Sequence, residues 1–319
     1  MASLLAPHHI DEDAAIAHLE SLHWPDGPIC PHCGLVGEAY KLNGATTRKG
    51  LRKCKGCRKP FTVRMKTIFE DSKIPLHKWL LAIHLLCSSK KGMSAHQLWR
   101  NLWGEHEKSG KTKGSYRSAW FMLHRIRWAM GQEPLAEKLS GIFEIDEVWI
   151  GGRQRLGARV NGQNPRHGKD VNDNKTPVAT VLQRGGKVRS YPKVNGTQLR
   201  PILDEMLDKA ESHIMTDSAN KMAFGKHGWK HSAVNHKAKE YARHEDGLTI
   251  TTNTVEGYFA IVQRGVNGIY HQIGKHYLDQ YLREFDFRYN GRKLNDSQRT
   301  EQAIKQTSGK RLMLKQPRD

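Results

Sequence analysis

The chain has 319 residues, of which 52 are Lys or Arg and 32 are Asp or Glu, so its formal net charge at pH 7 is +20. Only 37% of the residues are hydrophobic, and the longest apolar run, residues 79–87, is far shorter than the roughly 20 residues that a membrane-spanning helix needs. The composition therefore argues against a membrane-spanning protein and favours one that binds polyanions, and the length predicts two or three domains.

Residues 1–23 are predicted to form an acidic helical segment, because they contain Asp and Glu but no Lys or Arg. Ile10, Ala14 and Ala17 recur at the spacing of one helix face. The segment lacks the positive charge and the long apolar core of a secretory signal, so the expected compartment is the cytoplasm.

A zinc ribbon is predicted over residues 24–74. Four of the five cysteines form two C-x2-C pairs separated by 20 residues. Each pair supplies two thiolates from one tight turn, and a tetrahedral zinc ion needs four such ligands. The predicted zinc ligands are Cys30, Cys33, Cys54 and Cys57. The basic side chains around the second pair that are predicted to contact DNA are Arg52, Lys53, Lys55 and Arg58.

A helical region is predicted over residues 75–140. Pro75 suits a first helical turn, and apolar residues then follow the spacing of an amphipathic helix. This stripe comprises Trp79, Leu80, Ile83, Leu86 and Cys87. Gly92 ends the helix, and two more helices are predicted over residues 93–102 and, after a polar loop, around residues 120–130. Three helices with a glycine after the first resemble a helix-turn-helix unit, and the alternative is a helical spacer.

From residue 141 the pattern changes to strands, predicted over residues 142–150, 177–182 and 188–194, with a hairpin turn between the last two. A helix from Thr197, a strand over 213–217, a helix over 218–224, a strand near 232–235 and a long helix from about Thr252 follow. This order is found in ribonuclease H-like folds, so residues 141–292 are predicted to form such a mixed α/β domain. The whole chain is then an α+β multidomain protein.

Two polar stretches are predicted to lack regular structure. Residues 151–174 are rich in Gly, Asn and Arg and should form a mobile loop. Residues 293–319 form a basic tail that is poor in aromatic residues, and it is predicted to be disordered or a trailing arm.

Three acidic residues lie on separate elements of the predicted catalytic domain. Asp146 is in the first strand, Asp217 ends the fourth, and Glu256 is in the first turns of the long helix. Carboxylates in apolar strands are costly to bury unless they bind a cation, and three of them could hold two Mg²⁺ or Mn²⁺ ions for phosphodiester chemistry. Taken singly, Asp217 could cap a helix and Glu256 could complement a helix dipole.

Two neighbours of these acids offer alternatives. Glu147 adjoins Asp146 but should point to the opposite face of the strand, because side chains alternate. Asn253 lies one turn before Glu256 and is the rival for the third position.

Several motifs in order now point to a known family. They are the two cysteine pairs, residues 120–127, the Ile145–Gly152 motif Ile-Asp-Glu-Val-Trp-Ile-Gly-Gly, Thr216-Asp217, residues 234–236, Thr252–Gly257, Arg264-Gly265 and residues 281–290. This set resembles the ISXO-like class of bacterial insertion-sequence transposases, which join an N-terminal zinc ribbon to a DDE catalytic domain. The resemblance covers residues 24–292, nearly the whole chain.

The resemblance implies a DNA transposase that binds the terminal inverted repeats of its element, cuts there in a metal-dependent reaction and joins the 3′ ends to a target. Asp146 and Asp217 match the two family aspartates, and the third motif contains both Asn253 and Glu256. Related transposases often place Lys or Arg about two turns after the third acid to hold the end DNA. Here Gln263 occupies that position, which departs from the family pattern, and Arg264 next to it is the candidate DNA contact.

The implied partners are double-stranded DNA, as inverted repeats and as target, and at least one further copy of the chain on that DNA, because transposases bring two ends together. The implied location is the bacterial cytoplasm, at the nucleoid when DNA is bound. An inactive, domesticated DNA-binding regulator is the alternative, because the charge and the ribbon fit it equally well. A structure-selective nuclease on the same fold is a third reading.

Overall fold

The computed structural model describes residues 4–104, 114–131, 137–151, 175–194, 196–218 and 224–312, except the side chains of residues 196 and 197. It divides the chain into two compact units, Met1–Gly131 with Gly291–Asp319, and Gln132–Asn290. Most of the loop predicted over residues 151–174 and most of the helix predicted over 218–224 lie outside the described residues; Gly151 instead ends a strand.

The first unit begins with two short helices, α1 (Pro7–Ile10) and α2 (Glu12–His23). Asp11 separates them, because its side chain accepts a hydrogen bond from the Ala14 amide at 2.8 Å and caps α2. The predicted stripe is therefore wrong. Ile10 is 60% exposed, and α2 instead buries Ala15, Ile16 and Leu19.

A small antiparallel sheet follows, in the order β1-β2-β3, formed by β1 (Ala39–Lys41), β2 (Arg52–Cys54) and β3 (Pro60–Phe61). Cys30, Cys54 and Phe61 are its buried residues, and Trp24 packs on Phe61 edge-on, with ring centroids 5.8 Å apart. With so few buried side chains, this segment depends on further cross-links for its stability.

Four longer helices complete the first unit: α3 (Leu76–Ser88), α4 (Ala95–Trp103), α5 (Tyr116–Ala129) and α9 (Asp296–Lys305). The whole stripe predicted for α3 is buried. The helix α9 lies in the tail predicted to be disordered or a trailing arm, so residues 296–305 correct that prediction. It is held by a capping box between Asn295 and Gln298 and packs on α3, where Thr300 contacts His84 at 3.2 Å.

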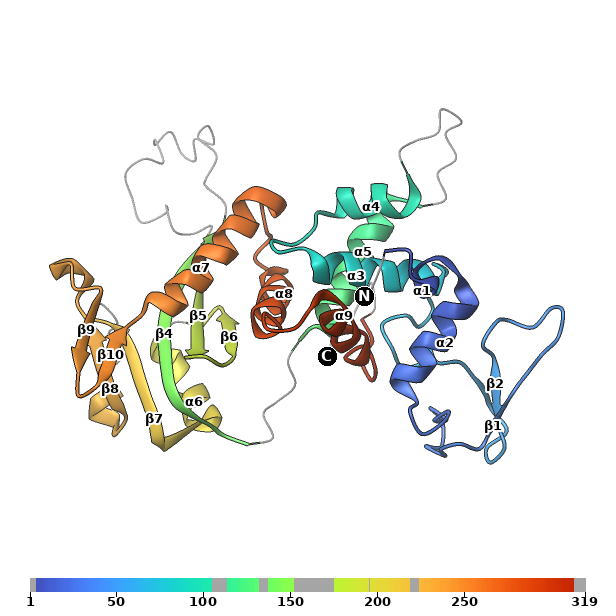
Figure 1. Cartoon of the computed structure of the whole chain (residues 1–319), viewed down its shortest axis with the longest axis horizontal. Helices are drawn as coiled ribbons and strands as arrows, with labels where there is room; N and C mark the ends of the chain where they lie inside the picture. Colours follow the sequence, from blue (N-terminus) through green and yellow to red (C-terminus); the bar gives the residue numbers. More distant parts are fainter. Residues whose placement is uncertain are drawn as a thin grey trace, which may run out of the picture. The chain divides into compact units, whose positions relative to one another are not determined.

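The second unit contains a five-stranded sheet in the order β6-β5-β4-β7-β8 (Figure 1). Its strands are β4 (Leu139–Gly151), β5 (Lys175–Gln183), β6 (Val188–Pro192), β7 (Leu207–Asp217) and β8 (Lys230–Val234). The pairs β4–β5 and β5–β6 are antiparallel, whereas β4–β7 and β7–β8 are parallel. The predicted hairpin between the second and third strands is confirmed.

Helices cover both faces of this sheet. On one face α6 (Gly196–Met206) packs its Leu199 and Leu203 against Phe143 and Ile145. On the other, α7 (Asn253–Gly265) and α8 (Leu278–Asn290) pack against Ile150, Val178 and Leu182. Because side chains alternate along β4, the even-numbered residues from 144 to 150 face α7 and α8.

The segment that leads into α7 contains structure that the sequence pattern did not predict. A hairpin of β9 (Ala242–Glu245) and β10 (Leu248–Thr251) precedes the helix. Short helical turns are η2 (Phe224–His227), η3 (His236–Ala238) and, after α7, the π-helical η4 (Val266–Tyr270). These strands are short and polar, so hydrophobic alternation is too weak to reveal them.

Candidate metal centre and carboxylate site

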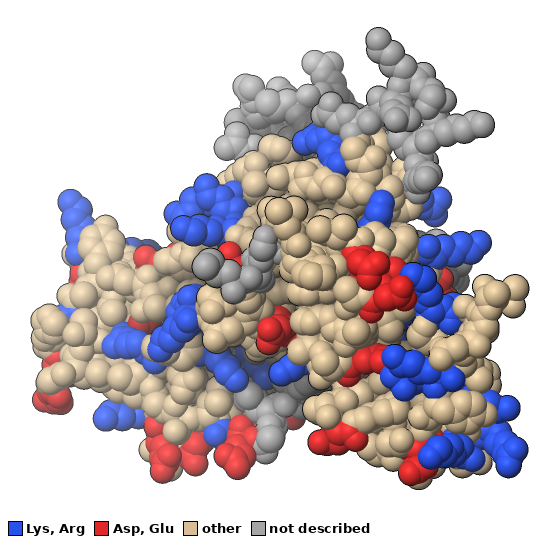
Figure 2. Space-filling view, turned by 45° about the vertical axis from the view of Figure 1, so that its right-hand side comes forward, with Lys and Arg blue, Asp and Glu red and all other residues tan. Residues whose placement is uncertain are grey.

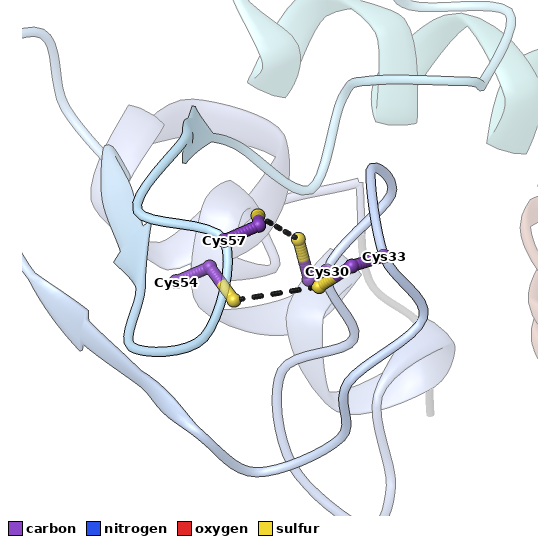
Figure 3. Close-up of side chains that lie close together, drawn as sticks. All are labelled: Cys30, Cys33, Cys54 and Cys57. Atoms are coloured by element: carbon purple, nitrogen blue, oxygen red, sulfur yellow. Dashed lines mark hydrogen bonds between the residues drawn. The ribbon is translucent and has the colours of Figure 1, made fainter.

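The four paired cysteines converge on one point (Figure 3). The Sγ atoms of Cys30 and Cys57 are 3.6 Å apart, those of Cys33 and Cys54 are 3.7 Å apart, and all four lie within 4.8 Å of one another. A tetrahedral zinc ion with Zn–S bonds of about 2.3 Å separates its sulfurs by about 3.8 Å. The cluster therefore fits zinc in both chemistry and size.

The surroundings of Cys30 favour its thiolate. Burial alone would raise the pKa of Cys30, but hydrogen bonds from the backbone amides of His32 and Cys33, together with those from the thiols of Cys33 and Cys57, lower it to about 6. His32 is exposed, and its Nε2 lies 3.3 Å from the carbonyl of Pro60, so it lies outside the cluster.

The basic residues beside the second pair differ in their contacts. Arg52 forms a bidentate pair with Glu20, at 2.9 Å from Nε and 2.6 Å from Nη2, and each of the two side chains is only 13% exposed. Lys55 pairs with Glu38 at 2.9 Å on the surface, and Arg58 is exposed. Arg52 is thus part of the packing between α2 and β2, unlike Lys55 and Arg58.

The three predicted acids lie at one end of the second unit's sheet. The parallel register of β4 and β7 pairs Glu144 with Met215, and Asp146 and Asp217 each follow two residues later. Glu256 is in the first turn of α7, on the face of the sheet toward which Asp146 points. Asp146 is close enough to Glu256 and Asp217 for both charges to raise its pKa.

His236 lies between two of these acids, although the sequence pattern gave it no role. Its Nδ1 is 3.8 Å from Asp217 Oδ2, and its Nε2 is 3.4 Å from Glu256 Oε1. The sequence did contain a signal for His236, because this residue directly follows the strand predicted near residues 232–235. That strand, β8, is parallel to β7 and pairs Val234 with Asp217. Residues just beyond such paired strand ends converge on one edge of a sheet.

Two of the acids accept hydrogen bonds within the site, and the pKa of one of them is raised. Thr252 Oγ1 donates a 2.8 Å hydrogen bond to Glu256 Oε1, and the Glu147 amide donates a 2.7 Å bond to Asp146 Oδ1. Burial, more than the neighbouring charges, raises the pKa of Asp146 to about 6. Asp146 therefore keeps its proton up to about pH 6 unless a cation or a bound partner compensates the charge.

Other predicted residues lie elsewhere. Asn253 is exposed at the start of α7, and Arg264 is exposed in its last turn. Within the described ranges, the cysteines are the one group of three or more potential ligands whose atoms gather within 4.8 Å. The three carboxylates are therefore spread more widely than the ligands of a single small ion.

Comparison with known protein families gives two matches, one in each of the two compact units. Residues 138–290 match the ISXO2-like transposase domain, and residues 10–60 match the transposase zinc-ribbon domain. The chain belongs to this family of insertion-sequence transposases. It is also 24% identical over 289 residues to an uncharacterized protein in transposable element ISH50 of Halobacterium salinarum, covering 88% of this chain and 91% of the relative.

No solved structure matches the chain significantly. None of the helices in the described ranges is long and apolar enough to cross a membrane.

Proposed function

We propose that the chain is a divalent-metal-dependent DNA transposase that binds the inverted repeats of its element, cuts DNA there and transfers the strand to a target. The observation that carries this proposal is that Asp146, Asp217 and Glu256, from three separate elements of the transposase-family unit, lie near one another and near His236. A DNA-binding protein without chemistry has no need for three neighbouring acids at one end of a sheet in a positively charged chain.

The sheet topology supports the same assignment. Three antiparallel strands, β6, β5 and β4, are followed on the β4 side by β7 and β8, which are parallel to β4. We expect this arrangement of a ribonuclease H-like catalytic domain. We assign the third catalytic position to Glu256 rather than Asn253. Glu256 contacts His236 and Thr252, whereas Asn253 is exposed at the helix start.

Oxygen ligands of this kind suit Mg²⁺ or Mn²⁺, and we propose that Asp146, Asp217 and Glu256 hold the ions. Two such ions, if bound there, would activate the attacking oxygen and stabilise the leaving one, and two ions need a wider set of ligands than one ion does. Thr252 fixes the orientation of the Glu256 carboxylate through its hydroxyl. His236 lies between Asp217 and Glu256, with its ring nitrogens 3.8 and 3.4 Å from their carboxylate oxygens.

DNA is the proposed partner of both units. Figure 2 shows Lys and Arg side chains spread over one face among acidic ones, rather than gathered in a single patch. We assign DNA contacts to Lys53, Lys55, Arg58 and Arg264, and a structural role to Arg52 because of its buried pair with Glu20. Pairing two element ends requires at least a dimer on DNA.

The test is a cleavage and joining assay on duplex oligonucleotides that carry the inverted repeats flanking this gene. With Mg²⁺ or Mn²⁺ we expect cleavage at the repeat tips, and Asp146→Asn should reduce its rate at least 10²-fold without weakening DNA binding. Glu147→Gln is the matched control, because this neighbouring acid points to the opposite face of β4.

Specific binding without cleavage under any metal condition would replace the proposal with the inactive regulator. Cleavage that does not depend on the terminal repeats would instead indicate a structure-selective nuclease. Equal loss of activity in Asp146→Asn and Glu147→Gln would refute the assignment of Asp146 to the catalytic site.

A further inference from the structure

A second acid lies on β4 beside the candidate site. Glu144 precedes Asp146 by two residues, so both side chains point to the face that α7 covers. Glu144 is fully buried, with 0% exposure. A buried carboxylate next to a metal site would ordinarily be a candidate ligand, and its hydrogen bonds decide against that role.

Both oxygens of Glu144 are occupied by donors. Oε2 accepts from the backbone amides of Thr254 at 2.8 Å and Val255 at 3.0 Å. Oε1 accepts from the Thr254 hydroxyl at 2.8 Å and from Arg184, whose Nε and Nη2 lie 3.0 and 2.8 Å away. Five donors leave the carboxylate no lone pair directed at a metal ion.

These contacts make Glu144 the cap of α7, supplied by a distant strand. The first amides of a helix lack intrahelical partners, and a side chain at the N-cap residue usually accepts from them. Thr252, the N-cap residue of α7, makes no such bond, and its hydroxyl donates to Glu256 instead. The Asn253 amide is satisfied by Thr251 Oγ1 at 3.2 Å, and Glu144 accepts from the next two.

Arg184 connects Glu144 to β10, the strand that precedes α7. We call the contacts of Glu144 and Arg184 with β10 and the first turn of α7 the anchor. It lies just after β5, where its amide donates to the Ile142 carbonyl at 2.8 Å. Its Nη1 donates to the Thr249 carbonyl at 2.8 Å, and its Nη2 lies 3.3 Å from the Thr251 carbonyl. The guanidinium thus joins the sheet to β10, which runs directly into α7.

We propose that Glu144 and Arg184 are positioning residues, which fix the first turn of α7 on the sheet and so set the place of Glu256 relative to Asp146 and Asp217. This inference rests on the proposed function of the carboxylate site. It predicts that loss of the anchor weakens metal binding more than it slows the reaction at saturating metal. The reason is that a displaced Glu256 can still be recruited by a high metal concentration.

The test measures the Mn²⁺ midpoint of end cleavage and, separately, Mn²⁺ binding to the zinc-loaded protein by electron paramagnetic resonance. Glu144→Gln removes the charge while keeping the shape of the side chain. We expect both midpoints to rise at least tenfold, with at least half of the wild-type rate recovered at saturating Mn²⁺. Amide hydrogen exchange in residues 253–258 should also become faster.

Glu284→Gln is the matched control. Glu284 and Arg288 form another buried ion pair in the same unit, within α8 and away from the first turn of α7. Its loss should lower thermal stability but leave the Mn²⁺ midpoints within twofold of wild type. If Glu144→Gln does not fold, Thr254→Val removes one of the five donors and should raise the midpoints about twofold to fivefold.

Unchanged midpoints in a folded Glu144→Gln or Thr254→Val protein would overturn the inference, as would an equal shift in Glu284→Gln. Wild-type protein that binds Mn²⁺ but cuts no end DNA would refute the proposed transposase activity alone, because the binding midpoints still test the anchor. Wild-type protein that binds no Mn²⁺ at this site would overturn both.

Discussion

At the residue scale, the acids of β4 show how neighbouring side chains of one kind take different roles. Glu144 is buried and both of its oxygens are fully hydrogen-bonded, whereas Asp146 accepts a hydrogen bond from the Glu147 amide and lies near two other acids. Donors satisfy the oxygens of Glu144, whereas burial and, to a smaller extent, the neighbouring negative charges raise the pKa of Asp146. Local sequence cannot separate the two, because both have the residue type and the strand parity of a site residue.

The raised pKa of Asp146 gives a prediction about stability and pH. Its pKa is about 6 in the folded protein, against an ordinary value near 4 in an unfolded chain. The folded state thus binds the proton more tightly, so this group makes the free energy of unfolding fall as pH rises from about 4 to about 6, with no further change above that.

Asp146→Asn removes the ionisable group and with it this loss of folding stability at higher pH. In zinc-containing buffer without Mg²⁺ or Mn²⁺, the variant should be more stable than wild type above pH 6 by on the order of 1–2 kcal/mol, and the two should converge near pH 4. Urea denaturation across this pH range measures the difference, with Glu147→Gln as the control. A variant that is less stable than wild type at pH 7.5 would contradict the assigned charge environment.

At the element scale, we expect the zinc ribbon to be the part whose fold depends most on a bound ion. Its small hydrophobic cluster consists of Cys30, Cys54 and Phe61, with Trp24, Ala39, Cys57 and Met65 packed against them. Because three of these residues are predicted zinc ligands, we expect the metal to supply much of the folding free energy. We expect one zinc ion per chain in the wild type and almost none in Cys54→Ser, in which residues 24–65 should become sensitive to protease.

Cys87→Ala is the control for that prediction, because Cys87 is buried in α3 and belongs to no cluster of metal ligands among the described residues. Zinc release measured with a chromogenic chelator, together with limited proteolysis, tests both variants. Full zinc occupancy in Cys54→Ser would show that the cluster is not the site.

Prediction of elements succeeded where hydrophobic patterns were strong. The stripe of α3 and the hairpin of β5 and β6 were correct, because apolar periodicity and a glycine turn determine them locally. The helix α9 was missed because its polar sequence gives little signal, and it is stabilised by its capping box and by packing on α3. The hairpin of β9 and β10 was also missed, because its strands are short and their hydrophobic alternation is weak.

At the scale of the whole molecule, the net charge of +20 predicts DNA binding that depends strongly on salt. If about 6–10 phosphates are contacted, affinity should fall by about 10³ to 10⁵ between 50 and 200 mM salt. Fluorescence anisotropy with labelled duplexes measures the slope. A flat salt dependence would contradict a phosphate-dominated interface.

Two arginines of the ribbon provide a sharper comparison. Arg58→Gln should reduce the magnitude of the salt slope by about one, because the exposed side chain is assigned to a phosphate. Arg52→Gln should leave the slope unchanged and lower the stability of the first unit, because it breaks a buried pair with Glu20. The reverse result would exchange the two assigned roles.

The cysteine spacing and the net charge were enough to predict a four-cysteine cluster and a polyanionic partner, because spacing within a tight turn is local and charge is additive. The structure confirms that the four cysteines converge. The family could also be recognised from its ordered motifs. The three-dimensional fold was needed to show which acids lie near one another, that His236 lies between Asp217 and Glu256, and that Glu144 caps α7 from a strand 110 residues away. Those relations join residues far apart in the chain, and only the register of the sheet and the packing of α7 on it bring such residues together.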